Sequence, residues 1–206
     1  MLKKNKSAKI KKKNRRFSDN TSLKQPREIK TKNPFRLERD FFMQKISAKF
    51  LAQSGVIAGL YVCLSLLVFP LASGAVQLRV GEALTLLPLL FGSAVPALLV
   101  GCIIVNLITG CVLIDVIVGS LVTLISAFLT YAIGRSIKNT FLKIFIGGLF
   151  PVLLNAFILP ITWVLAGIGE YAYLLQATLI FVGQVLSVYG LGTFLYLGIR
   201  KKIRKE

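Results

Sequence analysis

The sequence of 206 residues contains no histidine. A chain without imidazole cannot supply a histidine general base, a Ser-His-Asp or Cys-His nucleophile, or a zinc site that needs a histidine ligand. No GxxxxGK[ST] phosphate loop is present, so ATP hydrolysis by that route is not expected. The three cysteines form no CxxC pair and lie in apolar runs, which is typical of small buried residues. These absences argue against an enzyme and predict no catalytic residue, metal site or cofactor on this chain.

Charge is scarce in the middle of the chain. Residues 1–49 hold 17 Lys and Arg and 4 Asp and Glu, residues 200–206 hold 5 and 1, and residues 50–199 hold only 4 and 3. Hydrophobic residues make up 55% of the chain, which is more than a soluble domain normally carries. The sequence therefore predicts an all-α integral membrane protein with a basic segment at each end.

The number of membrane crossings follows from where the basic residues lie. A bilayer core takes about 20 apolar residues per helix, and five apolar blocks are long enough: 46–69, 81–110, 112–134, 144–166 and 171–199. The N-terminal segment, the loop from Arg135 to Lys143 and the C-terminal segment are all basic, so the positive-inside rule places all three in the cytoplasm. An even number of crossings must then precede the loop, so one of the first three blocks must hold two helices.

The block 81–110 is the one that divides. Its centre reads Gly92-Ser93-Ala94-Val95-Pro96, a turn signal followed by a proline suited to the start of a helix. The prediction is six transmembrane helices with both termini cytoplasmic, at about residues 46–69, 81–92, 94–110, 112–134, 143–166 and 171–199.

The domain organisation predicted from this is a basic disordered cytoplasmic tail over residues 1–45, a membrane domain over 46–199 and a second basic tail over 200–206. The first tail is expected to fix the topology and to rest on anionic lipid. Nucleic-acid binding is the alternative, but no aromatic residues are interleaved with the charge and no nucleic-acid-binding fold accompanies it.

The remaining polar residues gather at the predicted outer ends of the helices. Arg79, Glu82, Asp115 and Glu170 all fall there, and ionisable groups at membrane depth usually face a cavity or a partner because they are costly. Gln77 adds an amide to Arg79 and Glu82, and this trio suits a polar heterocycle better than an ion. A structural salt bridge between Arg79 and Glu82 is the alternative. A polar cluster that opens outward is therefore expected.

Four further side chains are candidates for the same site as Asp115. Asn106 and Asp115 flank the outer corner between two predicted helices, where Asp115 would bind a cation or an exocyclic amine, or would only be a helix-terminal acid. Asn155 and Gln184 lie inside the last two helices and would bind ligand or join helices by hydrogen bonds. Trp163 would stack on a ring or belong to an aromatic belt.

Small residues recur every three or four positions along the first predicted helix. They are Ala48, Ala52, Gly55 and Gly59. Such a stripe lets another helix approach closely. It serves either packing inside this bundle or docking of another subunit.

Several of these residues lie in segments that resemble the QueT-type queuosine-precursor transporters, which are substrate-binding S components of bacterial energy-coupling factor (ECF) transporters. The similarity covers about residues 46–200, and its specific element is the run Gln-x-Arg-x-x-Glu-Ala-Leu-Thr. The segments that carry it are Ala58-Gly59-Leu60-Tyr61-Val62, Val76-Gln77-Leu78-Arg79-Val80-Gly81-Glu82-Ala83-Leu84-Thr85-Leu86-Leu87-Pro88, Gly101-Cys102 to Asn106, Asp115-Val116-Ile117-Val118-Gly119-Ser120-Leu121, the Asn155 segment and Gly183 to Gly192. Gln184 departs from the family pattern, which often has an acid at that position.

The resemblance implies a six-helix bundle of the ECF S-component type in the bacterial cell membrane. Such a subunit captures a 7-deazaguanine such as pre-queuosine 1 and works with a scaffold transmembrane subunit and two ATPases that use the ATP. Glu82 or Asp115 would meet the donor groups of the ligand, Arg79 or Gln77 its carbonyl side, and an aromatic ring would stack. The full predicted set of substrate-binding residues is Gln77, Arg79, Glu82, Asn106, Asp115, Asn155, Trp163, Glu170 and Gln184. The alternatives are an S component for another vitamin or nucleobase and a membrane scaffold that binds no small molecule.

Overall fold

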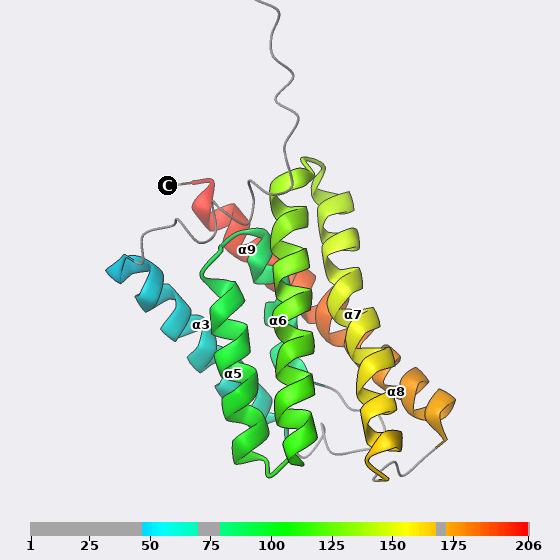
Figure 1. Cartoon of the computed structure of the whole chain (residues 1–206). Helices are drawn as coiled ribbons and strands as arrows, with labels where there is room; N and C mark the ends of the chain where they lie inside the picture. The colour runs from blue at the N-terminus through cyan, green and yellow to red at the C-terminus, as the bar shows by residue number, and fades with distance from the viewer. Residues whose placement is uncertain (1–46, 70–78, 168–171, 206) are drawn as a thin grey trace, which may run out of the picture. The chain divides into compact units, whose positions relative to one another are not determined.

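The computed structural model describes residues 47–69, 79–167 and 172–205, and every regular element in these ranges is a helix. The elements are α3 (Ala48–Leu67), the 3₁₀ helix η1 (Val80–Leu89), α5 (Ala94–Ile108), α6 (Leu113–Ser136), α7 (Thr140–Leu165), α8 (Tyr173–Val185), the π-helical turn η2 (Leu186–Gly192) and α9 (Thr193–Ile203). Elements α8, η2 and α9 form one continuous helical rod (Figure 1). The predicted tail over residues 1–45 lies outside the described residues.

In the described part of the chain six helical segments cross the bundle, in agreement with the number predicted. Helices α3, α6, α7 and the rod from Tyr173 to Ile203 are long and apolar enough to span a membrane, and η1 and α5 are shorter apolar helices. Consecutive segments run in opposite directions (Figure 1). The start of α3, the α6–α7 loop and the end of α9 therefore lie toward one end, and the α5–α6 corner lies at the other.

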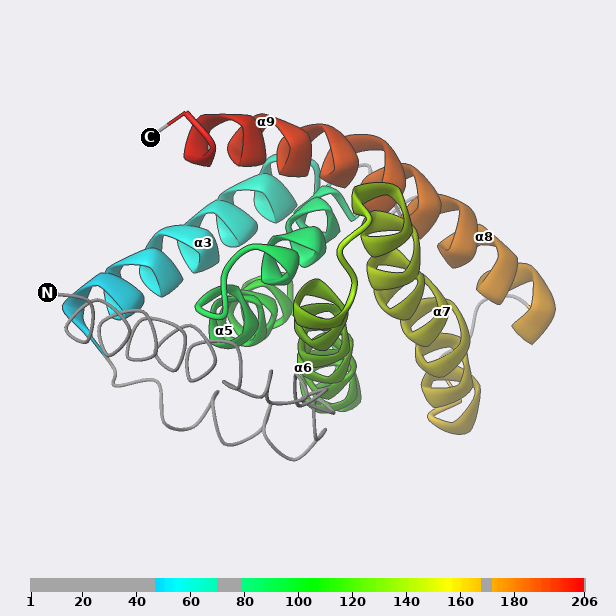
Figure 2. The ribbon, with the colours of Figure 1, turned by 90° about the horizontal axis from the view of Figure 1, so that it is seen from above.

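Helix η1 is the central element of the bundle. All its residues from Gly81 to Leu89 are buried, and it contacts α3, α5, α6, α7, η2 and α9. Figure 2 shows these helices arranged around the middle of the bundle. A 3₁₀ helix rises about 2.0 Å per residue against 1.5 Å for an α-helix, so ten residues span about 20 Å rather than 15 Å. This explains how a segment that is short for a transmembrane α-helix extends through the core.

Glycines of the neighbouring helices bring their backbones directly against η1. A Cβ atom at Gly192 would lie 2.7 Å from the carbonyl oxygen of Ala83, and one at Gly134 would lie 2.8 Å from the Cα and carbonyl oxygen of Leu89. Real Cβ atoms do not approach backbone this closely. These two glycines therefore fix how tightly η2 and α6 pack on η1.

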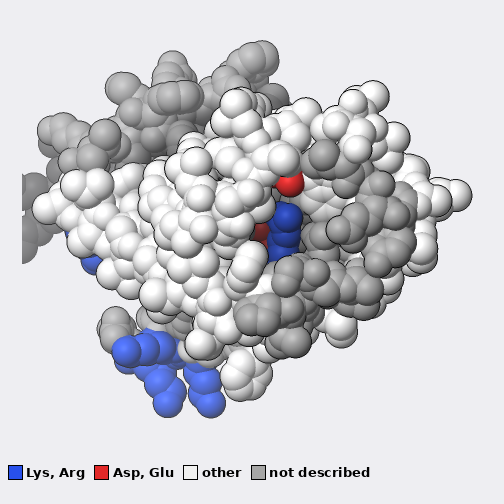
Figure 3. Space-filling model, turned by 90° about the horizontal axis from the view of Figure 1, so that it is seen from below, with Lys and Arg blue, Asp and Glu red and all other residues white. Residues whose placement is uncertain are grey.

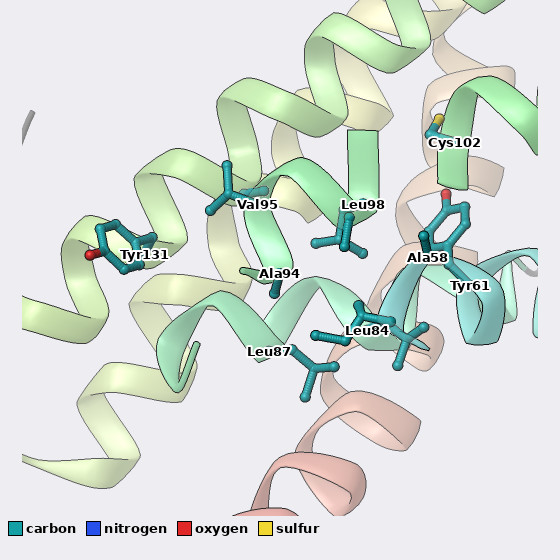
Figure 4. Packing of buried hydrophobic residues seen from close by; sticks show 12 residues of the cluster. Ala58, Tyr61, Leu84, Leu87, Ala94, Val95, Leu98, Cys102 and Tyr131 are labelled. Atoms are coloured by element: carbon teal, nitrogen blue, oxygen red, sulfur yellow. The ribbon is translucent and has the colours of Figure 1, made fainter. Parts of the chain in front are cut away.

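One apolar cluster joins α3, η1 and α5. Ala58 and Tyr61 of α3 pack with Leu84 and Leu87 of η1 and with Leu98 of α5 (Figure 4). Close packing of this kind stabilises helix contacts in a membrane by van der Waals attraction. The cluster positions Tyr61 in the interior of the bundle.

Helix α7 contains a proline whose missing hydrogen bond is compensated from α6. Pro151 has no N–H to donate, so the carbonyl of Gly147, four residues earlier, loses its partner within the helix. The hydroxyl of Thr130 on α6 donates to that carbonyl at 2.8 Å. The polar contact therefore ties α6 to α7 at a point where the backbone would otherwise be unsatisfied.

The boundaries of two helices at the end of the bundle with the α6–α7 loop differ from those predicted. Helix α7 begins at Thr140 rather than 143, because the Asn139 side chain accepts hydrogen bonds from the N–H groups of Phe141 and Leu142 and caps the helix there. Helix α9 continues to Ile203, so the first residues of the predicted tail 200–206 are helical. Arg200 donates to the Thr140 hydroxyl at 2.5 Å and holds this end of α9 against α7.

Candidate functional site

A cavity of about 260 Å³ opens at the end of the bundle that carries the α5–α6 corner. Figure 3 looks at this end and shows basic and acidic atoms inside a hollow in a mostly uncharged face. The described lining residues are Tyr61, Ser65 and Phe69 from α3 and the residues after it, Arg79 before η1, Val105, Asn106, Thr109 and Cys111 from α5 and its corner, Asp115 of α6 and Trp163 of α7. The structure thus brings Arg79, Asn106, Asp115 and Trp163, four of the predicted residues, to one cavity.

Asp115 and Trp163 form the link across this cavity. Asp115 lies in the first turn of α6 and Trp163 near the end of α7, and the antiparallel packing of the two helices brings these ends together. The indole N–H of Trp163 donates to Oδ1 of Asp115, and both residues are buried. The Asp115 Oδ2 atom accepts no hydrogen bond from the described part of the chain. One carboxylate oxygen therefore accepts the Trp163 N–H and orients the acid, and the other is available as an acceptor.

Asn106 ties α5 to the start of α6. Its Nδ2 donates to the backbone carbonyl of Asp115 at 3.2 Å and approaches the Cys102 sulfur at 3.6 Å. The nitrogen of this amide therefore has a structural role. Its Oδ1 atom is the part of the side chain that remains as an acceptor in the cavity wall.

Arg79 supplies the positive charge of the site. It directly precedes η1 and interacts electrostatically with both Glu82 and Asp115. The guanidinium group has five N–H donors in a planar fork, which suits carbonyl and carboxylate acceptors. The cavity thus combines a donor group from Arg79 with an acceptor from Asp115.

Glu82 lies beneath the cavity rather than in its wall. Its side chain is fully buried and is absent from the lining residues. The Tyr61 hydroxyl donates to Oε1 of Glu82 at 2.8 Å, while Oε2 has no partner among the described residues. The predicted pairing of Arg79 with Glu82 is not a side-chain hydrogen bond in the structure. One turn of 3₁₀ helix carries Glu82 about 6 Å further along the axis, and there its carboxylate accepts from Tyr61 instead of Arg79.

Two more predicted residues lie away from the cavity, and two others cannot be placed. Asn155 and Gln184 are each 1% exposed and lie deep in α7 and α8, outside the cavity lining. Asn155 donates to the Pro151 carbonyl of its own helix at 2.9 Å, so this hydrogen bond does not join two helices. Gln77 and Glu170 lie outside the described residues.

The sequence prediction missed the contribution of α3 to the cavity. Tyr61, Ser65 and Phe69 are spaced four residues apart, which places them on one face of a helix. Tyr61 is a polar aromatic residue in the middle of the first apolar block, far from the positions of an aromatic belt. That spacing and depth are the signals in the sequence that point to this wall of the cavity.

The small-residue stripe of α3 faces away from the described bundle. Ala48, Ala52, Gly55 and Gly59 are all exposed. A Cβ atom added at Gly55 or Gly59 would meet no other atom within 4 Å. Within the described residues this stripe therefore packs on no other helix, and docking of another subunit stays a prediction.

One protein family matches nearly the whole of the described bundle. The model of the QueT transporter family matches residues 51–201. Comparisons with curated proteins and with solved structures give no match. The family match covers well over half of the sequence and includes every lining residue of the cavity. The chain therefore belongs to the QueT transporter family, and it is a multi-pass membrane protein of a transporter family rather than an enzyme.

Proposed function

We propose that this chain is the substrate-binding membrane subunit of an ECF-type importer. It captures a queuosine precursor of the 7-deazaguanine class from outside the cell and delivers it inward with a scaffold transmembrane subunit and two ATPases. The observation that carries the proposal is the convergence of Arg79, Asn106, Asp115 and Trp163 on one cavity in a bundle of the QueT transporter family.

The chemistry of the cavity suits such a ligand. A 7-deazaguanine is a flat bicyclic ring with N–H donors and a carbonyl acceptor on its edge, and pre-queuosine 1 adds a cationic aminomethyl arm. Arg79 would donate to the carbonyl, Oδ2 of Asp115 would accept from the arm or from an N–H, and the Trp163 ring would stack. The volume of about 260 Å³ is slightly below the range of roughly 300–1,000 Å³ for drug-sized ligands, which favours a small molecule.

The charges at the two ends of the bundle support capture from outside. The α6–α7 loop and the residues beside it carry Arg135, Lys138 and Lys143, and the end of α9 carries Arg200. The positive-inside rule assigns this end to the cytoplasm of a bacterial cell. The cavity lies at the opposite end and would open outward, with both termini cytoplasmic.

Binding by the purified subunit tests the ligand. Isothermal titration with pre-queuosine 1, riboflavin, thiamin and folate should give binding for pre-queuosine 1 alone, and Arg79→Ala and Asp115→Ala should each weaken it. Preference for another vitamin would make the chain an S component of different specificity. Absence of binding to every ligand would favour a membrane scaffold.

The exposed stripe of α3 is the proposed docking face for the scaffold subunit. Glycines there permit the close helix approach that stabilises helix pairs in membranes. Gly55→Leu with Gly59→Leu should impair co-purification with the scaffold and uptake, while the solitary subunit still binds ligand. Gly198→Leu on α9 is the matched control, because a Cβ there also meets nothing within 4 Å. Equal loss of assembly in the control would contradict the assignment of α3.

A further inference from the structure

Three side chains deep in the bundle have polar atoms with no hydrogen-bond partner among the described residues. They are Asn155 of α7, Gln184 of α8 and Ser187 of η2, and each is at most 1% exposed. The unpartnered atoms are Oδ1 of Asn155, both amide atoms of Gln184 and the hydroxyl of Ser187. Buried polar atoms in native proteins are almost always hydrogen-bonded, so several orphans in one region call for an explanation.

The packing of α7 against the rod of α8 and η2 is defined by apolar contacts at two levels. At one level Leu159 and Ile180 belong to the same cluster. At the other, Val152 and Val188 share a second cluster, and a Cβ at Gly148 would lie 3.2 Å from a Val188 methyl. The two helices are antiparallel, so these contacts fix their register (Figure 1).

This register brings Asn155 and Gln184 to the same level. Asn155 lies on α7 between the two levels of contact, three residues after one and four before the other. Gln184 lies on the rod between the same two levels, four residues from each, and residues four apart share a helix face. Ser187 follows Gln184 by three residues at the same side of the rod. We call these three residues the inner amide cluster.

The inner amide cluster carries no charge and offers both hydrogen-bond donors and acceptors. A free primary amide offers two N–H donors beside a carbonyl acceptor, and Asn155 Oδ1 adds a second acceptor. Lipid supplies no hydrogen bonds at this depth, so the partner must come from inside the bundle. A group that presents an adjacent donor and acceptor fits such an amide, as in the pairing of Asn or Gln with a base edge.

We propose that the inner amide cluster is a second polar site that binds an uncharged group with an adjacent donor and acceptor. The group is an ordered water molecule or the amide-like edge of the transported heterocycle. Trp163 at the cavity lies eight residues beyond Asn155, about 12 Å along α7, so this site is separate from the outer cavity wall. Binding of the heterocycle at this site rests on the proposed function, whereas binding of a water molecule does not.

A double-mutant cycle tests the site. Asn155→Leu, Gln184→Met and the double variant keep side-chain size and remove the amides, and thermal unfolding is measured without ligand beside the Kd for pre-queuosine 1. A shared bound water predicts that each single variant lowers Tm, that the double variant loses less than the sum, and that Kd stays unchanged. A bound heterocycle edge predicts at least about a tenfold rise in Kd for each single variant.

The proposal fails if Kd is unchanged and the Tm values of the variants show no coupling. No coupling means that the single variants leave Tm unchanged or raise it, or that their losses of Tm add up in the double variant. The three residues would then share no bound group. Thr162→Val is the control, since its hydroxyl already donates to the Leu159 carbonyl at 2.7 Å and should show no coupling to Gln184→Met. If the wild type fails to bind pre-queuosine 1, the proposed function fails, and the ligand-free cycle still decides the site.

Discussion

The contact between Thr130 and the Gly147 carbonyl gives a stability prediction that depends only on the fold. Thr130→Val keeps the shape of a fully buried side chain and removes the hydroxyl that donates at 2.8 Å. Pro151 cannot replace that donor, so the carbonyl is left unpaired in a buried position. An unsatisfied buried group costs about 1–3 kcal/mol. For a chain of this size, 2 kcal/mol corresponds to a fall in Tm of roughly 4–8 °C.

A second substitution separates this cause from a general packing defect. Pro151→Ala restores a backbone N–H that can donate to Gly147, so Thr130→Val should cost less than about 1 kcal/mol in that background. Thermal unfolding of the four proteins in one detergent measures the difference. Thr123→Val is the matched control on α6, because its hydroxyl donates at 2.9 Å to the carbonyl of Gly119, which keeps its own helix partner. Equal losses for Thr130→Val with and without Pro151 would refute the reasoning.

Two further substitutions test the packing of η1 and the charge of the cavity. Gly192→Ala should lower Tm strongly, because its Cβ would lie 2.7 Å from the Ala83 carbonyl oxygen, whereas Gly198→Ala meets open space and should be neutral or slightly stabilising in the same unfolding assay. Asp115→Asn keeps an acceptor for the Trp163 N–H and removes the charge, so Tm should stay near the wild type while binding of pre-queuosine 1 weakens at least about tenfold. Calorimetry with the same heterocycle lacking the aminomethyl arm is the comparison, and an equal loss for both ligands would show that this acid does not meet the arm.

The number of helical segments could be predicted from charge and one turn signal. Basic residues at three places set the parity of the crossings, and the Gly92–Pro96 segment identified the block that divides. The 3₁₀ form of η1 could not be predicted, because hydropathy reports how apolar a segment is and says nothing of its rise per residue. Nor does hydropathy report the close packing of the Gly134 and Gly192 backbones against η1.

The cavity residues also divide into those that the sequence predicted and one that it did not. Arg79, Asn106, Asp115 and Trp163 lie near helix ends, and antiparallel neighbours bring such ends together, so a polar pattern at the ends is enough to predict their meeting. Residues in the middle of a helix have no such constraint. Tyr61 was missed for this reason, although its depth and spacing were readable in the sequence.

Glu82 shows why depth has to be known before a role can be assigned. Its position three residues after Arg79 favours a shared site, and the two charges do interact. The 3₁₀ turn, however, places the carboxylate below the Tyr61 hydroxyl, which donates a hydrogen bond to one of its oxygens at 2.8 Å. A ligand in the proposed site would meet Tyr61 and Arg79 before Glu82. Glu82 would then act on it only indirectly, through the Tyr61 hydroxyl that it orients and the Arg79 charge that it balances. The same carboxylate one turn nearer the mouth would be a direct ligand contact.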